Sequence, residues 1–321
     1  MKGRKVIVDC DPGIDDVLAL LLLLRSPEMD VQGITIVGGN VPVELGAKNA
    51  QKALEMSGRE DIPVYLGDNK PLKRDLVTAQ ETHGQDGLGE NFFEVELKSV
   101  KEKSAVEFLV EKFSSEEEVE LIALGPLTNI AKSIAQKPKL YEKLNRLVTM
   151  GGSFKSHGNC SPVAEYNYWV DPQAANFVYK NIKCPIHMVG LDVTREIVLT
   201  PDLREWLNQI DTSLSRFVYD ITQFYVDFHW EWEKILGCVI NDPLAVAYAI
   251  NSDFCSGIER FVEIVEDGPA MGQSIVDVEH FYKKESNAKV LTNVDSKAFM
   301  KFFMERLFPN EIESLKHLEV I

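Results

Sequence analysis

Basic residues are scarce in this sequence of 321 residues, which carries 34 Lys and Arg against 50 Asp and Glu, for a formal net charge of -16. The chain has no basic run, so we expect no nucleic-acid partner, because nucleic-acid binding usually needs a basic face. The acidic balance favours solubility and disfavours binding to anionic membranes.

Long apolar runs and targeting signals are also missing. The longest apolar run, residues 17–24, is much shorter than the ~20 residues that span a bilayer. The opening stretch MKGRKVIVDCD has charged residues and then a strand-like apolar segment. Asp9 interrupts this apolar segment, so the stretch is a poor signal peptide. We therefore expect a cytoplasmic protein with no membrane partner.

Cysteine is sparse as well. The five Cys residues are odd in number, scattered, and form no Cys-x-x-Cys pair, so they indicate reduced thiols and not a disulfide or zinc framework. No linker, internal repeat or low-complexity segment interrupts the chain. Because 45% of the residues are apolar, a sizeable core can form, and we predict a single domain over residues 1–321.

Short apolar runs alternate with helical patterns along the chain. The runs that read as buried strands are residues 6–9, 33–39, 63–67, 119–125, 146–152 and 186–192. The helical patterns between and after them are residues 15–26, 44–58, 104–115, 127–136 and 171–180. This alternation predicts an α/β fold with an open, doubly wound, mostly parallel sheet flanked by helices. We also expect residues 202–250 to be wholly helical and residues 261–281 to form a small C-terminal β-hairpin around Asp267-Gly268.

Four carboxylates follow the first predicted strand, in the sequence DCDPGIDD at residues 9–16. Ligands of open α/β sheets bind at the carboxyl ends of the strands, where these acids lie. A helix dipole stabilises Asp15 and Asp16 by at most about 1 kcal/mol, which does not neutralise four acids. Hard oxygen ligands instead favour Ca²⁺ or Mg²⁺. Adjacent helix positions diverge by about 100°, so we expect one of Asp15 and Asp16 to bind metal and the other substrate.

An opening strand followed by Asp-x-Asp resembles the haloacid-dehalogenase-like phosphatases, in which the first Asp is a nucleophile beside Mg²⁺. Their motif continues with Gly-Thr, whereas this one continues with Pro-Gly-Ile-Asp-Asp, and no later acidic pair completes their metal site. A phosphohydrolase of that type is one alternative function.

The chain as a whole more closely resembles the inosine–uridine-preferring nucleoside hydrolases. Besides DCDPGIDD, the blocks that resemble the family, in the family's order, are GGN (38–40), LGPLTNIA (124–131), MGGS (150–153), AEYN with DPQAA (164–175), GLDVT (190–194) and NDPLAVA (241–247). The resemblance implies one bound Ca²⁺, a homodimer or homotetramer, and hydrolysis of the N-glycosidic bond of purine or pyrimidine ribonucleosides to free base and ribose.

The resemblance also implies individual roles. The metal ligands would be Asp11, Asp16, the backbone carbonyl of Leu124, and Asp242, with Asp11 acting in addition as general base on the attacking water. The residues that would hold the ribose are Asp15, Asn40, Met150, Asn159, Glu165, Asn167 and Asp242. The role of Asp9 stays open. Asp171, by contrast, is expected only to cap a helix that begins at Pro172.

The sequence departs from the family where the leaving base needs a proton. Asn241 stands where well-known members carry a His, and an amide cannot act as the acid. A non-catalytic ribonucleoside-binding protein is therefore a second alternative function. His83, in a Gly-rich loop, is the first candidate replacement. Tyr225 and His229, four residues apart on one helix face, are the others, and all three are expected to contact substrate.

Two tryptophans near this face, Trp230 and Trp232, could stack on a purine base. We expect a nucleoside hydrolase with altered or weak leaving-group activation, and the sequence leaves its base preference open.

Overall fold

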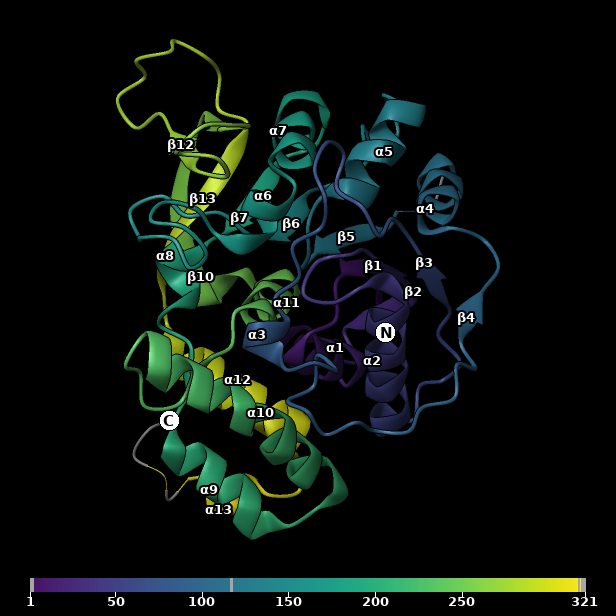
Figure 1. Cartoon of the computed structure of the whole chain (residues 1–321), viewed down its shortest axis with the longest axis vertical. Helices are drawn as coiled ribbons and strands as arrows, with labels where there is room; N and C mark the ends of the chain where they lie inside the picture. The colour runs from purple at the N-terminus through teal and green to yellow at the C-terminus, as the bar shows by residue number, and fades with distance from the viewer. Residues whose placement is uncertain (1–2, 116–117, 317, 319–321) are drawn as a thin grey trace.

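The computed structural model describes residues 3–115, 118–316 and 318, and nine strands of these residues form one sheet. Figure 1 shows this sheet at the centre of the molecule. In spatial order the strands are β10 (Cys255–Arg260), β13 (Ala288–Val294), β7 (Ile186–Val189), β6 (Leu147–Met150), β5 (Glu120–Ala123), β1 (Arg4–Cys10), β2 (Met29–Ile36), β3 (Val64–Leu66) and β4 (Val100–Lys101). Neighbouring strands are parallel, except that β10 runs antiparallel to β13 at one edge.

Helices cover both faces of the sheet (Figure 1). On one face lie α1 (Ile14–Leu24), α2 (Val43–Ser57), α11 (Asp242–Ile250) and α12 (Ser296–Leu307), and on the other α4 (Ala105–Ser114), α5 (Thr128–Gln136) and α7 (Pro172–Asn181). Consecutive residues of β1 enter different cores: Val6 and Val8 pack with the first set, and Ile7 with the second. The predicted doubly wound, mostly parallel α/β fold is therefore confirmed.

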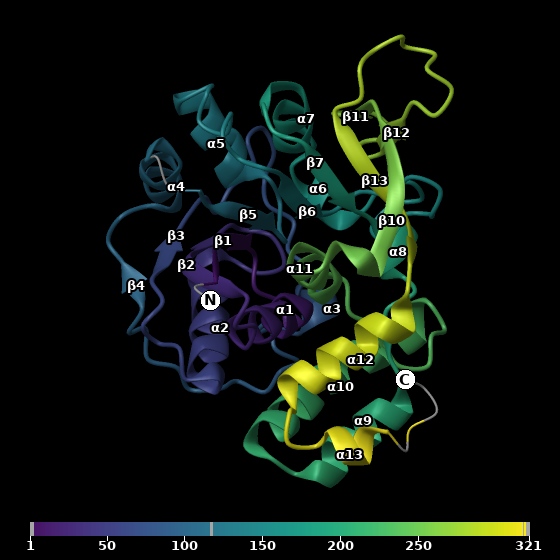
Figure 2. The ribbon, with the colours of Figure 1, turned by 180° about the vertical axis from the view of Figure 1, so that it is seen from behind.

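The two ends of the molecule differ in structure. Figures 1 and 2 show α9 (Pro201–Ile210), α10 (Ser213–Trp232), α12 and α13 (Ile312–Leu315) gathered at one end. At the other end, β11 (Val262–Ile264) pairs antiparallel with β12 (Ser274–Val276), as the predicted hairpin requires. Gly268 lies at its turn with a φ of 76°.

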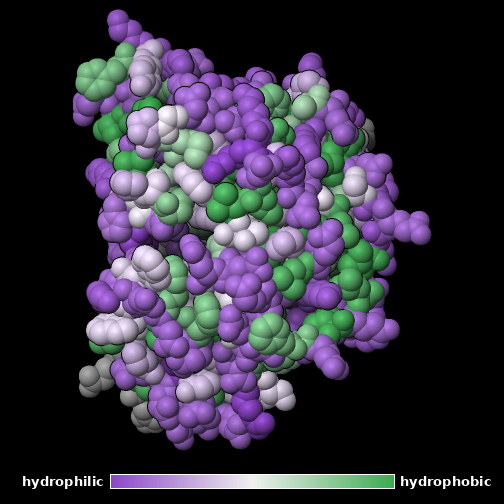
Figure 3. Space-filling model, viewed as in Figure 1, coloured by the Kyte–Doolittle hydropathy of each residue, from purple (hydrophilic) through white to green (hydrophobic). Residues whose placement is uncertain are grey.

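Figure 3 shows a mostly hydrophilic surface with apolar residues in small groups. Among the described residues, no helix combines the length and apolar character that crossing a membrane requires.

The prediction that residues 202–250 are wholly helical is wrong. Between α10 and α11 the chain forms β9 (Cys238–Val239), which pairs antiparallel with β8 (Val198–Leu199). Lys234 and Gly237 have φ values of 58° and 112°, and a helix cannot continue through such conformations. The remaining short helical elements are α3 (Gln80–His83), α6 (Tyr166–Val170), α8 (Leu191–Thr194) and η1 (Ser252–Phe254).

Local sequence explains where the helices begin and end. Asp16, in the first turn of α1, accepts a hydrogen bond from the backbone N–H of Gly13, which precedes the helix. Ser104 and Glu107 form a reciprocal capping pair at the start of α4. Gly58, with a φ of 63°, ends α2. These signals position the turns that follow the strands.

The strand β1 lies at the topological switch point of the sheet. From β1 the chain runs outward through β2, β3 and β4, and it returns through β5 to the other side of β1. At such a point the loops that follow neighbouring strands diverge and leave a crevice at their carboxyl ends. The segment of residues 9–16, which carries the acids, runs from the end of β1 into the first turn of α1 and lies at this crevice.

Asp171 stabilises the fold as its sequence context predicts. Its Oδ1 accepts from the backbone N–H of Ala174 at 3.0 Å, and its Oδ2 accepts from Thr128 Oγ1 at 2.7 Å and from the Leu72 N–H at 2.9 Å. The buried carboxylate therefore joins α7, α5 and the loop after β3.

We expect Asp171→Ala to lower the free energy of unfolding by roughly 3 kcal/mol, the combined effect of a lost cap and two lost hydrogen bonds. Denaturant unfolding followed by circular dichroism measures this change. Asp220→Ala, which removes an exposed Asp from α10, is the control. Equal stability of the two variants would contradict the assignment.

Candidate active site

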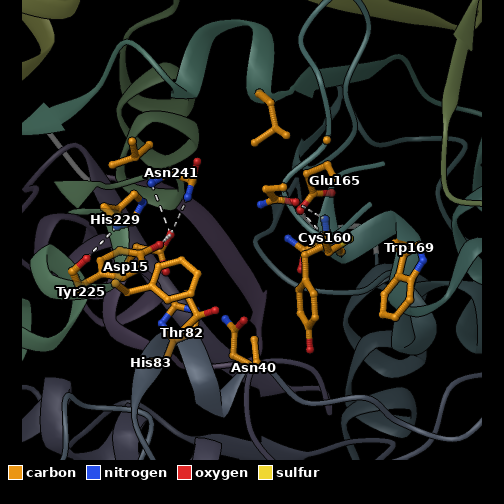
Figure 4. Close-up of a pocket in the computed structure, with 18 of the residues that line it drawn as sticks. Asp15, Asn40, Thr82, His83, Cys160, Glu165, Trp169, Tyr225, His229 and Asn241 are labelled. Atoms are coloured by element: carbon orange, nitrogen blue, oxygen red, sulfur yellow. Dashed lines mark hydrogen bonds between the residues drawn. The ribbon is translucent and has the colours of Figure 1, made fainter. Parts of the chain in front are cut away.

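A cavity of about 510 Å³ opens at the carboxyl ends of β1, β2, β5 and β6. Its volume suits a small organic molecule. Figure 4 shows labelled side chains of its wall facing one another across an open space. The sequence-predicted residues that line it are Asp15, Asn40, His83, Leu124, Met150, Asn159, Glu165, Asn167, Tyr225, His229 and Asp242. Asp11 and Asp16, also predicted, are fully buried beside them.

Three carboxylates converge at one side of this cavity. Oxygen atoms of Asp15, Asp16 and Asp242 all lie within 4.8 Å of one another, close enough for a single cation to contact all three. Asp15 and Asp16 thus both place an oxygen near Asp242, and the expectation that one of them binds metal and the other substrate stays a prediction. Asp242 opens α11, so a residue more than 200 positions along the chain completes the cluster that the first loop begins.

Asp11 sits in a backbone cradle beside this cluster. Its Oδ2 accepts from the backbone N–H of Asn40 at 2.7 Å, and its Oδ1 is buried with no partner among the described residues. A Cβ atom at Gly39 would lie 1.9 Å from Asp11 Oδ2, and one at Gly125 would lie 2.5 Å from Oδ1. Both glycines are therefore required for the carboxylate to occupy this place.

Burial makes the acid cluster hard to ionise. Loss of hydration raises the pKa of Asp16 to about 7, with the charge of Asp15 adding to the effect. Loss of hydration, followed by the nearby carboxylates, also raises the pKa of Asp11 and Asp242 well above the usual range. Oδ1 of Asp242, like that of Asp11, has no partner among the described residues. Unpartnered, desolvated oxygens of this kind suit a hard divalent cation, whose positive charge would favour the ionised form of the carboxylates.

Asp9 lies behind the cluster and does not line the cavity. Its Oδ2 accepts from Thr35 Oγ1 at 2.5 Å and from Asn129 Nδ2 at 2.9 Å. Burial raises its pKa to about 7. These contacts join β1 to β2 and α5, so Asp9 orders the strand ends on which the site is built.

Asn159, Asn167 and Glu165 contribute amide and carboxylate groups to the cavity wall. Asn167 Nδ2 donates to the carbonyls of Leu124 at 2.6 Å and Met150 at 3.2 Å. A carbonyl oxygen has two lone pairs, so Leu124 can accept this bond and still serve as a ligand. Asn159 Oδ1 accepts from the backbone N–H of Tyr166 at 3.0 Å.

Glu165 caps α6 from inside the cavity wall. Its two oxygens accept from the backbone N–H groups of Asn167, Gly152 and Tyr168 at 2.8, 2.8 and 3.2 Å. Burial raises the pKa of Glu165 to about 7, although these donors oppose the shift. The carboxyl group is thus rigidly held at the cavity surface.

The three candidate replacements for the missing acid lie together. The rings of His83 and Tyr225 are 5.2 Å apart between centroids, and those of Tyr225 and His229 are 4.5 Å apart. His83 Nδ1 accepts from the backbone N–H of Ile14 at 3.1 Å, which places the ring proton on Nε2. Tyr225 donates its hydroxyl proton to Asp15 Oδ2 at 3.3 Å. His83 therefore presents an N–H donor, whereas the Tyr225 hydroxyl is already engaged.

Sequence reasoning missed part of the wall. The cavity is also lined by Thr82, His157, Tyr166, Trp169, Arg195, Phe228 and Glu233. Phe228 lies three residues after Tyr225, so helical spacing could have found it. Of the two predicted stacking residues, Trp232 lines the cavity and Trp230 does not. No local pattern signals Arg195, which donates to Glu233 Oε2 at 2.7 Å and to the Gly158 carbonyl at 3.0 Å.

Known proteins resemble this chain over nearly its whole length. A family model described as inosine-uridine preferring nucleoside hydrolase matches residues 6–301. The pyrimidine-specific ribonucleoside hydrolase RihA of Klebsiella pneumoniae (strain ATCC 700721 / MGH 78578) is 35% identical over 308 residues, which cover 94% of this chain and 97% of that protein. RihA of Escherichia coli O7:K1 is 34% identical over 306 residues, with the same coverage.

Two solved structures are similar in the same way. A plant nucleoside hydrolase, PpNRh1, has a TM-score of 0.90 and 32% identity, covering 95% of this chain and 98% of its own. A purine-preferring ribonucleoside hydrolase from Gardnerella vaginalis has a TM-score of 0.90 and 30% identity, covering 97% and 100%. These similarities favour the resemblance to the nucleoside hydrolases over the resemblance to the haloacid-dehalogenase-like phosphatases.

We expect Gly39→Ala to weaken divalent-cation binding at least about tenfold, because the new methyl group displaces Asp11 and mutations that disturb ligand support typically cost 10- to 100-fold in affinity. Titration calorimetry with Ca²⁺ measures the change. Gly58→Asn, at an open helix end where Asn tolerates the positive φ, is the matched control. Unchanged affinity in the Gly39 variant would mean that Asp11 does not contribute to cation binding.

Proposed function

This chain belongs to the inosine-uridine preferring nucleoside hydrolase family, and from that premise we propose that it hydrolyses the N-glycosidic bond of ribonucleosides, releasing ribose and the free base. The observation that carries the proposal is the arrangement of the cavity. A desolvated cluster of carboxylates lies at one side, and aromatic residues of α10 line another part of the wall. A ribonucleoside has matching parts, a sugar rich in hydroxyl groups and an aromatic base.

The resident cation in this proposal is Ca²⁺. Asp11, Asp16, Asp242 and the Leu124 carbonyl would hold it, and Asp15 lies close enough to share it. Ca²⁺ accepts about six to eight oxygen ligands in flexible geometry, which leaves places for water and ribose hydroxyls. When bound, the ion supplies positive charge that orients a water molecule and lowers its pKa.

Asp11 is the general base in this proposal. Its Oδ1 is buried and has no partner among the described residues, so it can accept a proton from the attacking water. Its Oδ2 is fixed by the Asn40 N–H at 2.7 Å. The carboxylate is therefore held in one orientation while one oxygen stays available for proton transfer.

The remaining polar wall holds and stabilises the sugar. Cleavage of the glycosidic bond develops oxocarbenium-like positive charge on the ribose. Carboxylate and amide oxygens around the ring, supplied by Asp15, Asn40, Asn167 and Asp242, favour that charge. Asn159 and Glu165 would contact the 5′-hydroxyl, and Met150 would lie under the sugar. Gripping several hydroxyls also orients the reacting carbon.

His83 is the proposed acid for the leaving base. Its Nδ1 is occupied by the Ile14 N–H, so Nε2–H is the donor that it can offer to a base in the cavity. Burial lowers the pKa of His83, which limits protonated imidazole near neutral pH and agrees with weak activation. Tyr225 and His229 would contact the base from α10.

A cytoplasmic location and a homodimer or homotetramer complete the proposal. The five cysteines are all free thiols in the structure, which suits a reducing compartment. Light scattering of the purified protein would measure the assembly directly.

We expect Asp11→Asn to lower kcat for ribonucleosides by about 10²- to 10⁴-fold, the usual contribution of a general base. Chelation of calcium should abolish ribose release from the unaltered protein, and added Ca²⁺ should restore it. Reducing-sugar release from a panel of purine and pyrimidine nucleosides measures both effects. Asp253→Asn, which alters an exposed Asp on η1, is the matched control.

This assay, together with phosphate-release and nucleoside-binding measurements, separates the alternative functions. Chelator-insensitive ribose release would contradict the role given to the metal. Phosphate release from ribose 5-phosphate without ribose release would favour a phosphohydrolase. Nucleoside binding without turnover would favour a binding protein.

We expect His83→Gln to lower kcat for natural nucleosides by roughly 10²-fold, because general acids typically contribute 10²- to 10⁴-fold. The variant should cleave p-nitrophenyl riboside, whose leaving group needs no acid, at nearly the original rate. The control is His157→Gln, because His157 also lines the cavity but has no proposed role in proton transfer. It should change the rates on both substrates little. If the unaltered protein cleaves p-nitrophenyl riboside no faster than uridine or inosine, weak leaving-group activation is wrong.

A further inference from the structure

The orientation of the Asn241 amide is determined by its neighbour. Asn241 Nδ2 donates to Asp15 Oδ2 at 3.1 Å, and the Asn241 backbone N–H donates to the same oxygen at 3.3 Å. A carboxylate can only accept hydrogen bonds, so the amide nitrogen must face Asp15 and the amide oxygen must face away. Figure 4 shows both bonds and the side chain turned in this way.

The amide oxygen of Asn241 accepts no hydrogen bond from the described residues. Asn241 Oδ1 is buried and has no hydrogen-bond partner among the described residues, although Asn241 itself lines the cavity. A buried acceptor without a partner is costly, and a ligand that supplies a donor removes the cost. The wall beside Asp15 therefore holds an acceptor that no described residue uses.

His229 adds a second acceptor to the same wall. Its Nδ1–H donates to the backbone carbonyl of Tyr225 at 2.7 Å, because that carbonyl can only accept. Burial lowers the pKa of His229, so the neutral ring keeps a lone pair on Nε2. Figure 4 shows His229 and Asn241 on one side of the cavity, next to Asp15.

An exocyclic amino group is the base substituent that fits. It carries two N–H donors, enough for Asn241 Oδ1 and His229 Nε2, whereas an oxo group at the same ring position would place lone pairs against two acceptors. We propose, on the basis of the nucleoside hydrolase function above, that this cavity selects ribonucleosides with an amino-substituted base, cytidine and adenosine, over their oxo counterparts uridine and inosine. Asn241 and His229 are the residues that determine this selection.

The first experiment compares matched substrates on the unaltered protein with Ca²⁺ present. We expect kcat/KM for cytidine to exceed that for uridine, and for adenosine to exceed that for inosine, by at least roughly tenfold, the effect of gained hydrogen bonds over unpaired acceptors. Ribose release with equal rates, or with faster uridine and inosine, would overturn the selectivity and leave the hydrolase function standing. No release from any of the four would overturn both.

Variants then assign the selection to its residues. Asn241→Leu removes the acceptor, and His229→Phe removes the other acceptor while keeping a ring against Tyr225. Each should lower the cytidine-to-uridine ratio of kcat/KM by roughly fivefold or more. The ratio is the readout because disturbance of Asp15 affects both substrates equally and cancels.

Controls keep the result specific to the cavity. Asn208→Leu, at an exposed position of α9, should leave the ratio unchanged. If Asn241→Leu and His229→Phe lower both substrates by the same factor, these groups contact the sugar and the proposal is wrong. Should one variant fail to fold, the other variant and the ratio for the unaltered protein still decide the question.

Discussion

Five carboxylates, those of Asp9, Asp11, Asp15, Asp16 and Asp242, share a region from which water is almost wholly excluded. Removing a charged carboxylate from water is very costly, and neighbouring negative charges increase the cost. Backbone N–H groups and amide side chains replace part of the lost hydration, and the cation of the proposed function would supply the positive charge that balances the cluster. Much of the surrounding architecture serves this replacement.

The sheet supplies the rigid part of that support. Its switch point opens a crevice beside β1, and the loop after β2 enters this crevice as Gly-Gly-Asn. Gly39 lets the backbone approach Asp11 closely enough for the Asn40 N–H to donate, and Asn40 Nδ2 also donates to Asp16 at 2.9 Å. One short loop thus orders two of the proposed metal ligands.

Two helices bring residues of the proposed base site to the cavity. The helix α10 carries Tyr225 and His229, and Asn241 directly precedes α11, which begins at Asp242. Asn241 is linked to the acid cluster through Asp15, so the same carboxylate lies beside both the proposed sugar site and the proposed base site. The Asn241 side chain cannot act as a proton donor of useful acidity, and its contact with Asp15 fixes its orientation.

The sequence by itself determined the α/β fold, because strands buried on both faces must be continuously apolar and the helices between them must follow their own period. It also placed Asp171 correctly, since a cap depends on neighbours only a few residues away. It was wrong about residues 202–250, where β9 forms by pairing with β8, a segment about 40 residues earlier in the chain. Only the tertiary structure decided that Asp15 and Asp16 converge with Asp242, that Arg195 reaches the cavity, and which way the Asn241 amide points. Those features depend on contacts between distant segments, and local sequence patterns carry no information about them.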